Sequence, residues 1–141
     1  MNTTVIIYAF AAGILPAFLW LWFWLREDNL HPEPRLAIML TFLIGMLSVA
    51  VAAYFEGIST AFTNGQTQQY IVWAIIEELA KSIAVICIAL FSSQIDEPID
   101  FMIYFLTAAL GFSALENSLF LLNPNTTNNF ASFVAVGDFR F

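Results

Sequence analysis

Residues 70–91 read YIVWAIIEELAKSIAVICIALF, an apolar run that is interrupted near its middle by Glu77, Glu78 and Lys81. A helix of about 20 apolar residues is long enough to cross the roughly 30 Å hydrocarbon core of a bilayer. A charged side chain at the centre of that core costs on the order of 3 kcal/mol. Charges at this depth therefore mark the run as the functional candidate of a membrane protein.

The composition of the whole chain also indicates a lipid solvent. Of the 141 residues, 60% are hydrophobic and only 11% are charged, whereas soluble domains carry about 25% charged residues. The net charge of −7 reflects a shortage of bases, and it excludes a nucleic-acid surface, which needs clustered Lys and Arg. The single cysteine, Cys87, cannot form an internal disulfide.

Four apolar runs predict an all-α, polytopic membrane protein. The expected transmembrane helices are residues 5–25, 36–55, 70–91 and 101–122. After the polar stretch 123–129 the chain becomes apolar again over residues 130–141, where we expect a fifth helix to start. Residues 1–141 then form a single membrane domain.

The basic residues predict an orientation in the cell membrane. Arg26 and Arg35 flank the first loop, and loops rich in Lys and Arg stay in the cytoplasm. The N-terminus is then outside. Arg140 falls on the opposite side and counts against this orientation.

Helical spacing places Lys81 within reach of both glutamates, since it follows Glu77 by four residues and Glu78 by three. One ammonium group compensates one carboxylate, so one negative charge is left over. That carboxylate can be protonated through desolvation, bound to a metal, or used to hold a proton for catalysis.

The next apolar run supplies Glu116 and Asn117. Glu78 lies about 12 Å from its end of the third run, and Glu116 lies about 9 Å from the corresponding end of the fourth. The two glutamates are thus expected at similar depth on neighbouring antiparallel helices. Small residues of the fourth run would allow a close approach of the backbones; they are Ala108, Ala109, Gly111, Ser113 and Ala114. We therefore expect one polar centre containing Glu77, Glu78, Lys81, Glu116 and Asn117.

Three functions are open at this point. The charges can lock helices together by ion pairing, as in a non-catalytic helical scaffold. They can carry protons or a substrate, as in a transporter subunit. They can also activate water for peptide hydrolysis, directly or through a metal.

Three sequence blocks resemble the PrsW family of intramembrane proteases, within the wider clan that includes the CAAX prenyl endopeptidases. They are Pro32-Glu33-Pro34 after the first run, Glu77-Glu78-x-x-Lys81, and Gly111-Phe112-x-x-x-Glu116-Asn117. The CAAX-type branch is less similar, because it usually has Arg in the first motif and His where Glu116 stands.

The resemblance implies an intramembrane endopeptidase that cleaves membrane-anchored proteins such as anti-sigma factors. It implies catalytic roles for Glu77, Glu78 and Glu116, with Lys81 and Asn117 in support. It also implies zinc or another divalent metal, for which Glu78 and Glu116 are the candidate ligands in this chain.

One difference from the family concerns histidine. PrsW-like proteins continue into further helices that carry histidines, whereas the only histidine here is His31, in the first loop. We therefore expect this sequence to lack part of its site, either as the N-terminal part of a longer protease domain or as a truncated, inactive homologue. The aromatic ending favours the first of these. Glu56, at the end of the second run, is a subsidiary candidate.

Overall fold

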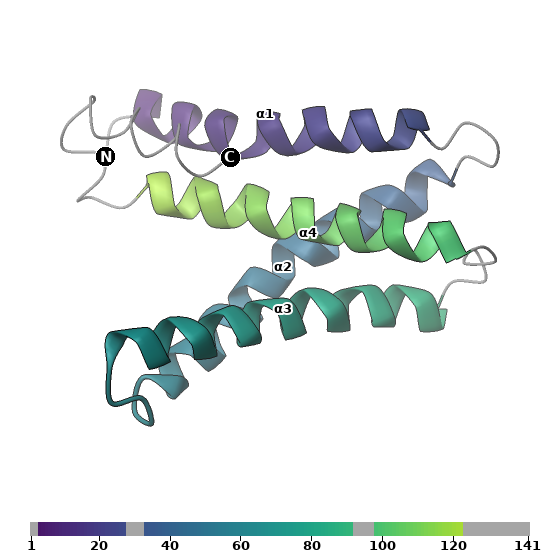
Figure 1. Ribbon diagram of the computed structural model, residues 1–141. Coiled ribbons are helices and arrows are strands. Elements are labelled where there is room, and N and C mark those ends of the chain that lie inside the picture. Colours follow the sequence, from purple (N-terminus) through teal and green to yellow (C-terminus); the bar gives the residue numbers. More distant parts are fainter. Residues whose placement is uncertain (1–2, 28–32, 92–97, 123–141) are drawn as a thin grey trace. The chain divides into compact units, whose positions relative to one another are not determined.

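The computed structural model describes residues 3–27, 33–91 and 98–122, and these ranges are almost entirely helical (Figure 1). The helices are α1 (Thr3–Glu27), α2 (Arg35–Ser59), α3 (Gln66–Phe91) and α4 (Pro98–Leu121). Each corresponds to one of the expected apolar runs, so the all-α prediction is confirmed. Residues 130–141, where a fifth helix was expected, lie outside the described ranges, as does His31.

The connection between α2 and α3 is shorter than the sequence suggested. α2 continues past Glu56, whose backbone carbonyl accepts hydrogen bonds from the Thr60 N–H at 3.2 Å and the Ser59 hydroxyl at 2.8 Å. At the start of α3, the Asn64 N–H donates to the side-chain oxygen of Gln68 at 3.2 Å. These local bonds extend both helices into a polar stretch that composition alone assigns to a loop.

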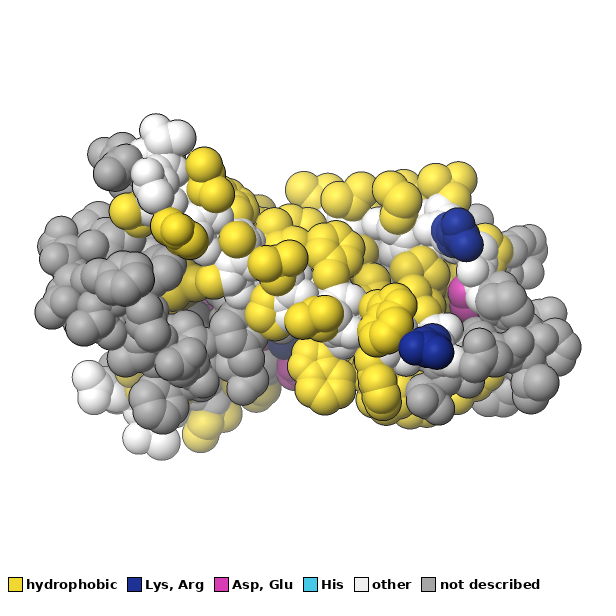
Figure 2. Space-filling view, turned by 90° about the horizontal axis from the view of Figure 1, so that it is seen from above, with side chains coloured by type: hydrophobic (Ala, Val, Ile, Leu, Met, Phe, Trp, Pro, Cys, Tyr) yellow, Lys and Arg dark blue, Asp and Glu magenta, His cyan; other side chains and the backbone are white. Residues whose placement is uncertain are grey.

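Three of the helices are long and apolar enough to cross a membrane: Thr3–Arg26, Arg35–Ser59 and Ile99–Leu121. Large hydrophobic side chains are exposed along them, and Figure 2 shows such side chains over most of the described part of the face in view. The chain is therefore a multi-pass membrane protein. α3 is 26 residues long but carries Glu77, Glu78 and Lys81 near its middle, and its membrane crossing stays a prediction.

The chain divides into two compact units. One contains α2, α3 and α4 as far as Phe112, over residues 33–112. The other contains α1 and the end of α4 from Ser113.

In the unit of residues 33–112, α2 and α4 cross at backbone contact. A Cβ atom added at Gly45 would overlap the carbonyl of Ala108, and one added at Gly111 would overlap the carbonyl of Phe42. We expected the small residues of α4 to bring it close to α3, but Ala108 and Gly111 lie against α2 instead. The physical reason is that α2 also has a glycine at the crossing, so both backbones can approach.

The other unit uses small residues in the same way. Ala9, Gly13 and Ala17 follow one another at four-residue spacing on α1, and all three are buried. A Cβ atom at Gly13 would lie 2.7 Å from the backbone nitrogen of Ser118 and 2.8 Å from the carbonyl oxygen of Ala114. α1 and the end of α4 are therefore also packed backbone to backbone.

Buried hydroxyl groups in both units bond to their own helices. The bonds run from Thr41 to the Ala37 carbonyl, from Ser48 to Gly45, from Thr107 to Ile103 and from Ser118 to Ala114, at 2.7–2.8 Å. Because each donor is satisfied within its helix, these small polar residues can pack in a helix interface without water.

Candidate functional site

The double glutamate of α3 forms an ion-pair cluster with Lys81, one helical turn further along. The Lys81 Nζ donates to Glu78 Oε1 at 2.7 Å, and lies 3.7 Å from Glu77 Oε2. Lys81 contacts both carboxylates because residues three and four apart share a helix face.

The three side chains differ in exposure. That of Lys81 is only 12% exposed, that of Glu77 is 29% exposed and that of Glu78 is 63% exposed. The ammonium group is thus the most deeply buried charge of the cluster, and the Glu78 carboxylate is the most open to a substrate or to water.

A second helix of the same unit contacts the ammonium group. The ring centroid of Phe112, from α4, lies 4.6 Å from Lys81 Nζ, and Phe112 is 2% exposed. Phe112 belongs to the second sequence motif, Gly111-Phe112-x-x-x-Glu116-Asn117. The sequence predicted no contact for it, and its place in that motif was the only indication of a role.

Glu116 and Asn117 belong to the other compact unit. Asn117 is 7% exposed, and Glu116 is half-buried and has interactions of its own. Their expected proximity to Glu77, Glu78 and Lys81 stays a prediction.

Glu33, the glutamate of the first motif, has a hydrogen-bond partner that was not predicted from the sequence. The hydroxyl of Tyr104 donates to Glu33 Oε2 at 2.6 Å, and Tyr104 is fully buried. The sequence feature that indicates such a contact is the Tyr104 hydroxyl inside an otherwise apolar run, because a buried tyrosine usually finds a hydrogen-bond partner. Glu33 and Tyr104 tie the start of α2 to the first part of α4.

Trp73 provides a hydrogen-bond donor near the cluster. Its indole nitrogen is buried and has no partner among the residues that the structure describes. Trp73 precedes Glu77 by four residues, so the two side chains share a face of α3.

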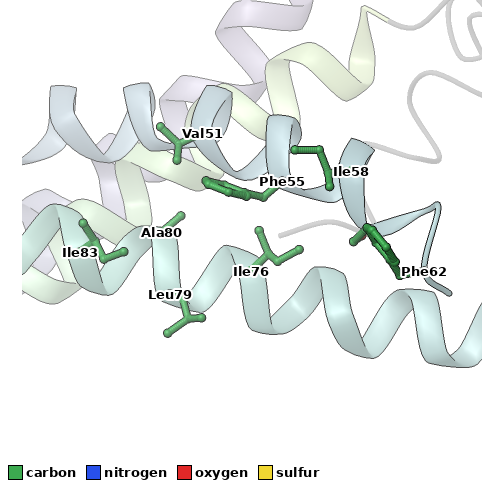
Figure 3. Close-up of a pocket in the computed structure, with 9 residues that line it drawn as sticks. Val51, Phe55, Ile58, Phe62, Ile76, Leu79, Ala80 and Ile83 are labelled. Carbon is green, nitrogen blue, oxygen red and sulfur yellow. The ribbon is translucent and has the colours of Figure 1, made fainter.

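An apolar groove of about 430 Å³ lies between α2 and α3 (Figure 3). Phe55 points from α2 toward α3, and Ile76 and Ala80 point back toward α2. The lining residues are Val51, Phe55, Ile58, Ser59, Phe62, Ile76, Leu79, Ala80 and Ile83. None of these lining residues is charged.

The described residues do not by themselves fit a catalytic zinc site. Such a site usually takes three protein ligands, and within residues 3–27, 33–91 and 98–122 no group of three or more His, Cys, Asp or Glu side chains could hold a metal ion. In addition, the Lys81 ammonium group already contacts one oxygen of Glu78. The assignment of Glu78 and Glu116 as metal ligands stays a prediction.

Comparison with known proteins points to one family. The model for the PrsW family of intramembrane metalloproteases matches residues 33–140. The Protease PrsW of Geobacillus kaustophilus (strain HTA426) is 28% identical over 115 residues, which cover 79% of this chain and 51% of the relative. That of Clostridioides difficile (strain 630) is 26% identical over 123 residues, covering 82% and 51%. The chain spans about half the length of these curated relatives, and no solved structure matches it.

Proposed function

The chain belongs to the PrsW family of intramembrane metalloproteases, and on this premise we propose that it acts as an intramembrane endopeptidase on membrane-anchored proteins. The observation that carries the proposal is the ion-pair cluster of Glu77, Glu78 and Lys81 in α3. Buried ionisable side chains in a membrane protein mark functional sites by default. In a protease family, their function is peptide hydrolysis.

The chemical step that we propose uses a glutamate as general base, with Glu78 or Glu77 in that role. Its carboxylate takes a proton from water while the water oxygen attacks the scissile carbonyl carbon. The resulting carboxylic acid then gives the proton to the amide nitrogen as the C–N bond breaks. Lys81 compensates the charge of the second carboxylate throughout.

Glu116 and Asn117 complete the proposed site as its second-motif members. The support is the sequence motif Gly111-Phe112-x-x-x-Glu116-Asn117, which resembles the second motif of the family.

The proposed hydrolysis uses carboxylates alone, because the described residues do not complete a ligand set for a metal. Chelation provides the test. Cleavage that survives dialysis against EDTA supports the carboxylate mechanism. Cleavage that is lost and then restored by zinc supports a metal-dependent step instead.

The depth of the cluster supports a substrate within the membrane. Glu77 lies about 16 Å from the start of α3 and about 21 Å from its end, so a scissile bond must enter the bilayer to reach it. Single-pass proteins such as anti-sigma factors, which the family resemblance suggests, meet that requirement.

The experiment compares glutamate variants of the complete protein that contains this sequence, on a single-pass anti-sigma-factor reporter in vesicles. We expect Glu78→Gln to abolish cleavage, because an amide cannot take a proton from water, while helix content and membrane insertion are unchanged. Cys87→Ser, a conservative change of an exposed α3 residue that the proposed step does not use, should keep activity. If the complete wild-type protein cleaves no reporter of a broad panel, the scaffold or transporter function replaces the protease. If Glu78→Gln stays fully active, Glu77 must be the base.

A further inference from the structure

Lys81 is the only lysine of the chain, and its ammonium group has a partner that does not come from its own helix. The Phe112 ring centroid lies 4.6 Å from Nζ, within the distance at which a ring face attracts a cation. The Phe112 side chain is 2% exposed and that of Lys81 is 12% exposed. The contact is therefore largely shielded from solvent, where such an attraction is strongest.

The packing of α2 against α4 fixes the position of the ring. Gly111, the residue before Phe112, lies so close to the carbonyl of Phe42 that no side chain would fit between them. Ala108 makes the same kind of contact with Gly45. Backbones that touch at two points cannot slide or rotate freely, so Phe112 is held at one depth and facing one direction.

A ring suits this position better than a third carboxylate. Lysine carries a compact charge on a flexible stem, and in a dry environment that charge needs neighbours on more than one side. An aromatic face attracts the ammonium group without carrying a charge and without being able to accept its proton. The full positive charge thus stays available to Glu77 and Glu78.

From this geometry we propose that Phe112 is a positioning residue for the double glutamate. Its ring holds the Lys81 ammonium group against Glu78 and beside Glu77, and without the ring the lysine moves away from both carboxylates. The consequence for cleavage rests on the proposed protease function. The contact between ring and ammonium group does not.

The first experiment measures the reactivity of Lys81 in the full chain, reconstituted in phosphatidylcholine vesicles. Acetic anhydride acylates only the uncharged amine, and peptide mapping by mass spectrometry reads the product at the single lysine. Because the ring covers the Lys81 ammonium group and holds it against the carboxylates, we expect Phe112→Leu to raise the acylation rate about two- to fivefold. Phe112→Trp, which keeps an aromatic face, should react at the wild-type rate.

The matched control is Phe105→Leu. Phe105 lies on the same face of α4, seven residues before Phe112, and is half-buried. It should leave the acylation rate unchanged. An unchanged rate in Phe112→Leu, or an equal increase in Phe105→Leu, would overturn the proposal.

The second experiment separates the charge of the ring from its volume. Phenylalanine analogues with one, two or three fluorine atoms at position 112 keep the ring shape and progressively remove negative charge from its face. We expect the acylation rate to rise with each fluorine, while circular dichroism and thermal unfolding show that every variant folds. A flat series would mean that the ring acts by packing only, and the proposal would fail.

The third measurement connects the contact with catalysis. On the reporter, Phe112→Leu should lower kcat about tenfold, because it misplaces the Lys81 charge, and should change KM less than twofold. Phe112→Trp should have the wild-type kcat. A normal kcat in Phe112→Leu overturns the positioning role even if the fluorine series is graded. If the wild-type chain cleaves nothing, the protease proposal fails, and the fluorine series still decides whether Phe112 holds Lys81.

Discussion

Tyr104 and Glu33 join two parts of the chain that are 71 residues apart in sequence. Glu33 stands immediately before α2, in the first of the three motifs, and Tyr104 lies in the second turn of α4. A hydrogen bond to an ionised carboxylate contributes about 1.5–3 kcal/mol, more than a bond between neutral groups. Through this contact, the glutamate of the first motif holds the start of α2 against α4.

We expect Tyr104→Phe to destabilise the folded protein by about 1.5 kcal/mol, because the carboxylate of Glu33 loses this donor while the ring volume is kept. Unfolding in mixed detergent micelles, followed by circular dichroism, measures the change in free energy. Tyr54→Phe is the control, since Tyr54 is exposed on α2. Equal stability of the two variants would show that the hydrogen bond contributes nothing.

Contacts within one helix could be predicted from sequence, and contacts between helices could not. The reach of Lys81 to Glu77 and Glu78 follows from helical periodicity alone. The pairing of Tyr104 with Glu33, and of Phe112 with Lys81, depends on how α4 is rotated against its neighbours. That rotation is set by backbone contacts with other helices, and these cannot be predicted from the hydrophobic pattern of one helix.

At the scale of helices, glycine and alanine decide where the elements meet. Run length was enough to predict all four helices, because hydrophobic stretches of this length have few alternatives in a bilayer. The partner of each stripe of small residues was not predictable, because several helices carry one. The small residues of α4 illustrate this: Ala108 and Gly111 serve the contact with α2, whereas Ala114 lies beside Gly13 of α1.

Gly45→Ala tests the crossing of α2 and α4. Helix propensity alone would favour alanine by about 1 kcal/mol, but the added Cβ would overlap the Ala108 carbonyl. Because overpacking typically costs 1–3 kcal/mol and the obstacle is rigid backbone, we expect a net loss of about 2 kcal/mol in the free energy of unfolding.

Gly57→Ala on the same helix is the matched control for Gly45→Ala. No atom lies within 4 Å of a Cβ added there, so this variant should be as stable as the wild type or slightly more stable. A Gly45→Ala protein that is equally stable would contradict the close crossing.

At the scale of the whole molecule, the sequence predicted the fold class and the family but not the assembly of the site. The motif blocks were visible because each is short and lies within one helix or its flank. That these blocks form one site stays a prediction, because it depends on tertiary packing that no single helix encodes. The same limit applies to the metal, since its ligands must converge from several helices.

The crossing of α3 and the orientation of the chain can be tested together by cysteine labelling in right-side-out membrane vesicles. Cys87 is exposed, so it is first replaced by Ser, and single cysteines are then introduced at Asn64 and Ser93. If Arg26 and Arg35 keep the first loop in the cytoplasm, as the sequence predicts, and if α2 and α3 both cross, Asn64→Cys should react with an impermeant maleimide. Ser93→Cys should then react only after the vesicles are opened. Labelling of both positions from outside would mean that α3 does not cross, and the reversed pattern would invert the orientation. We expect α3 to cross, because Lys81 compensates one of the two glutamates at a depth where an isolated charge would be costly.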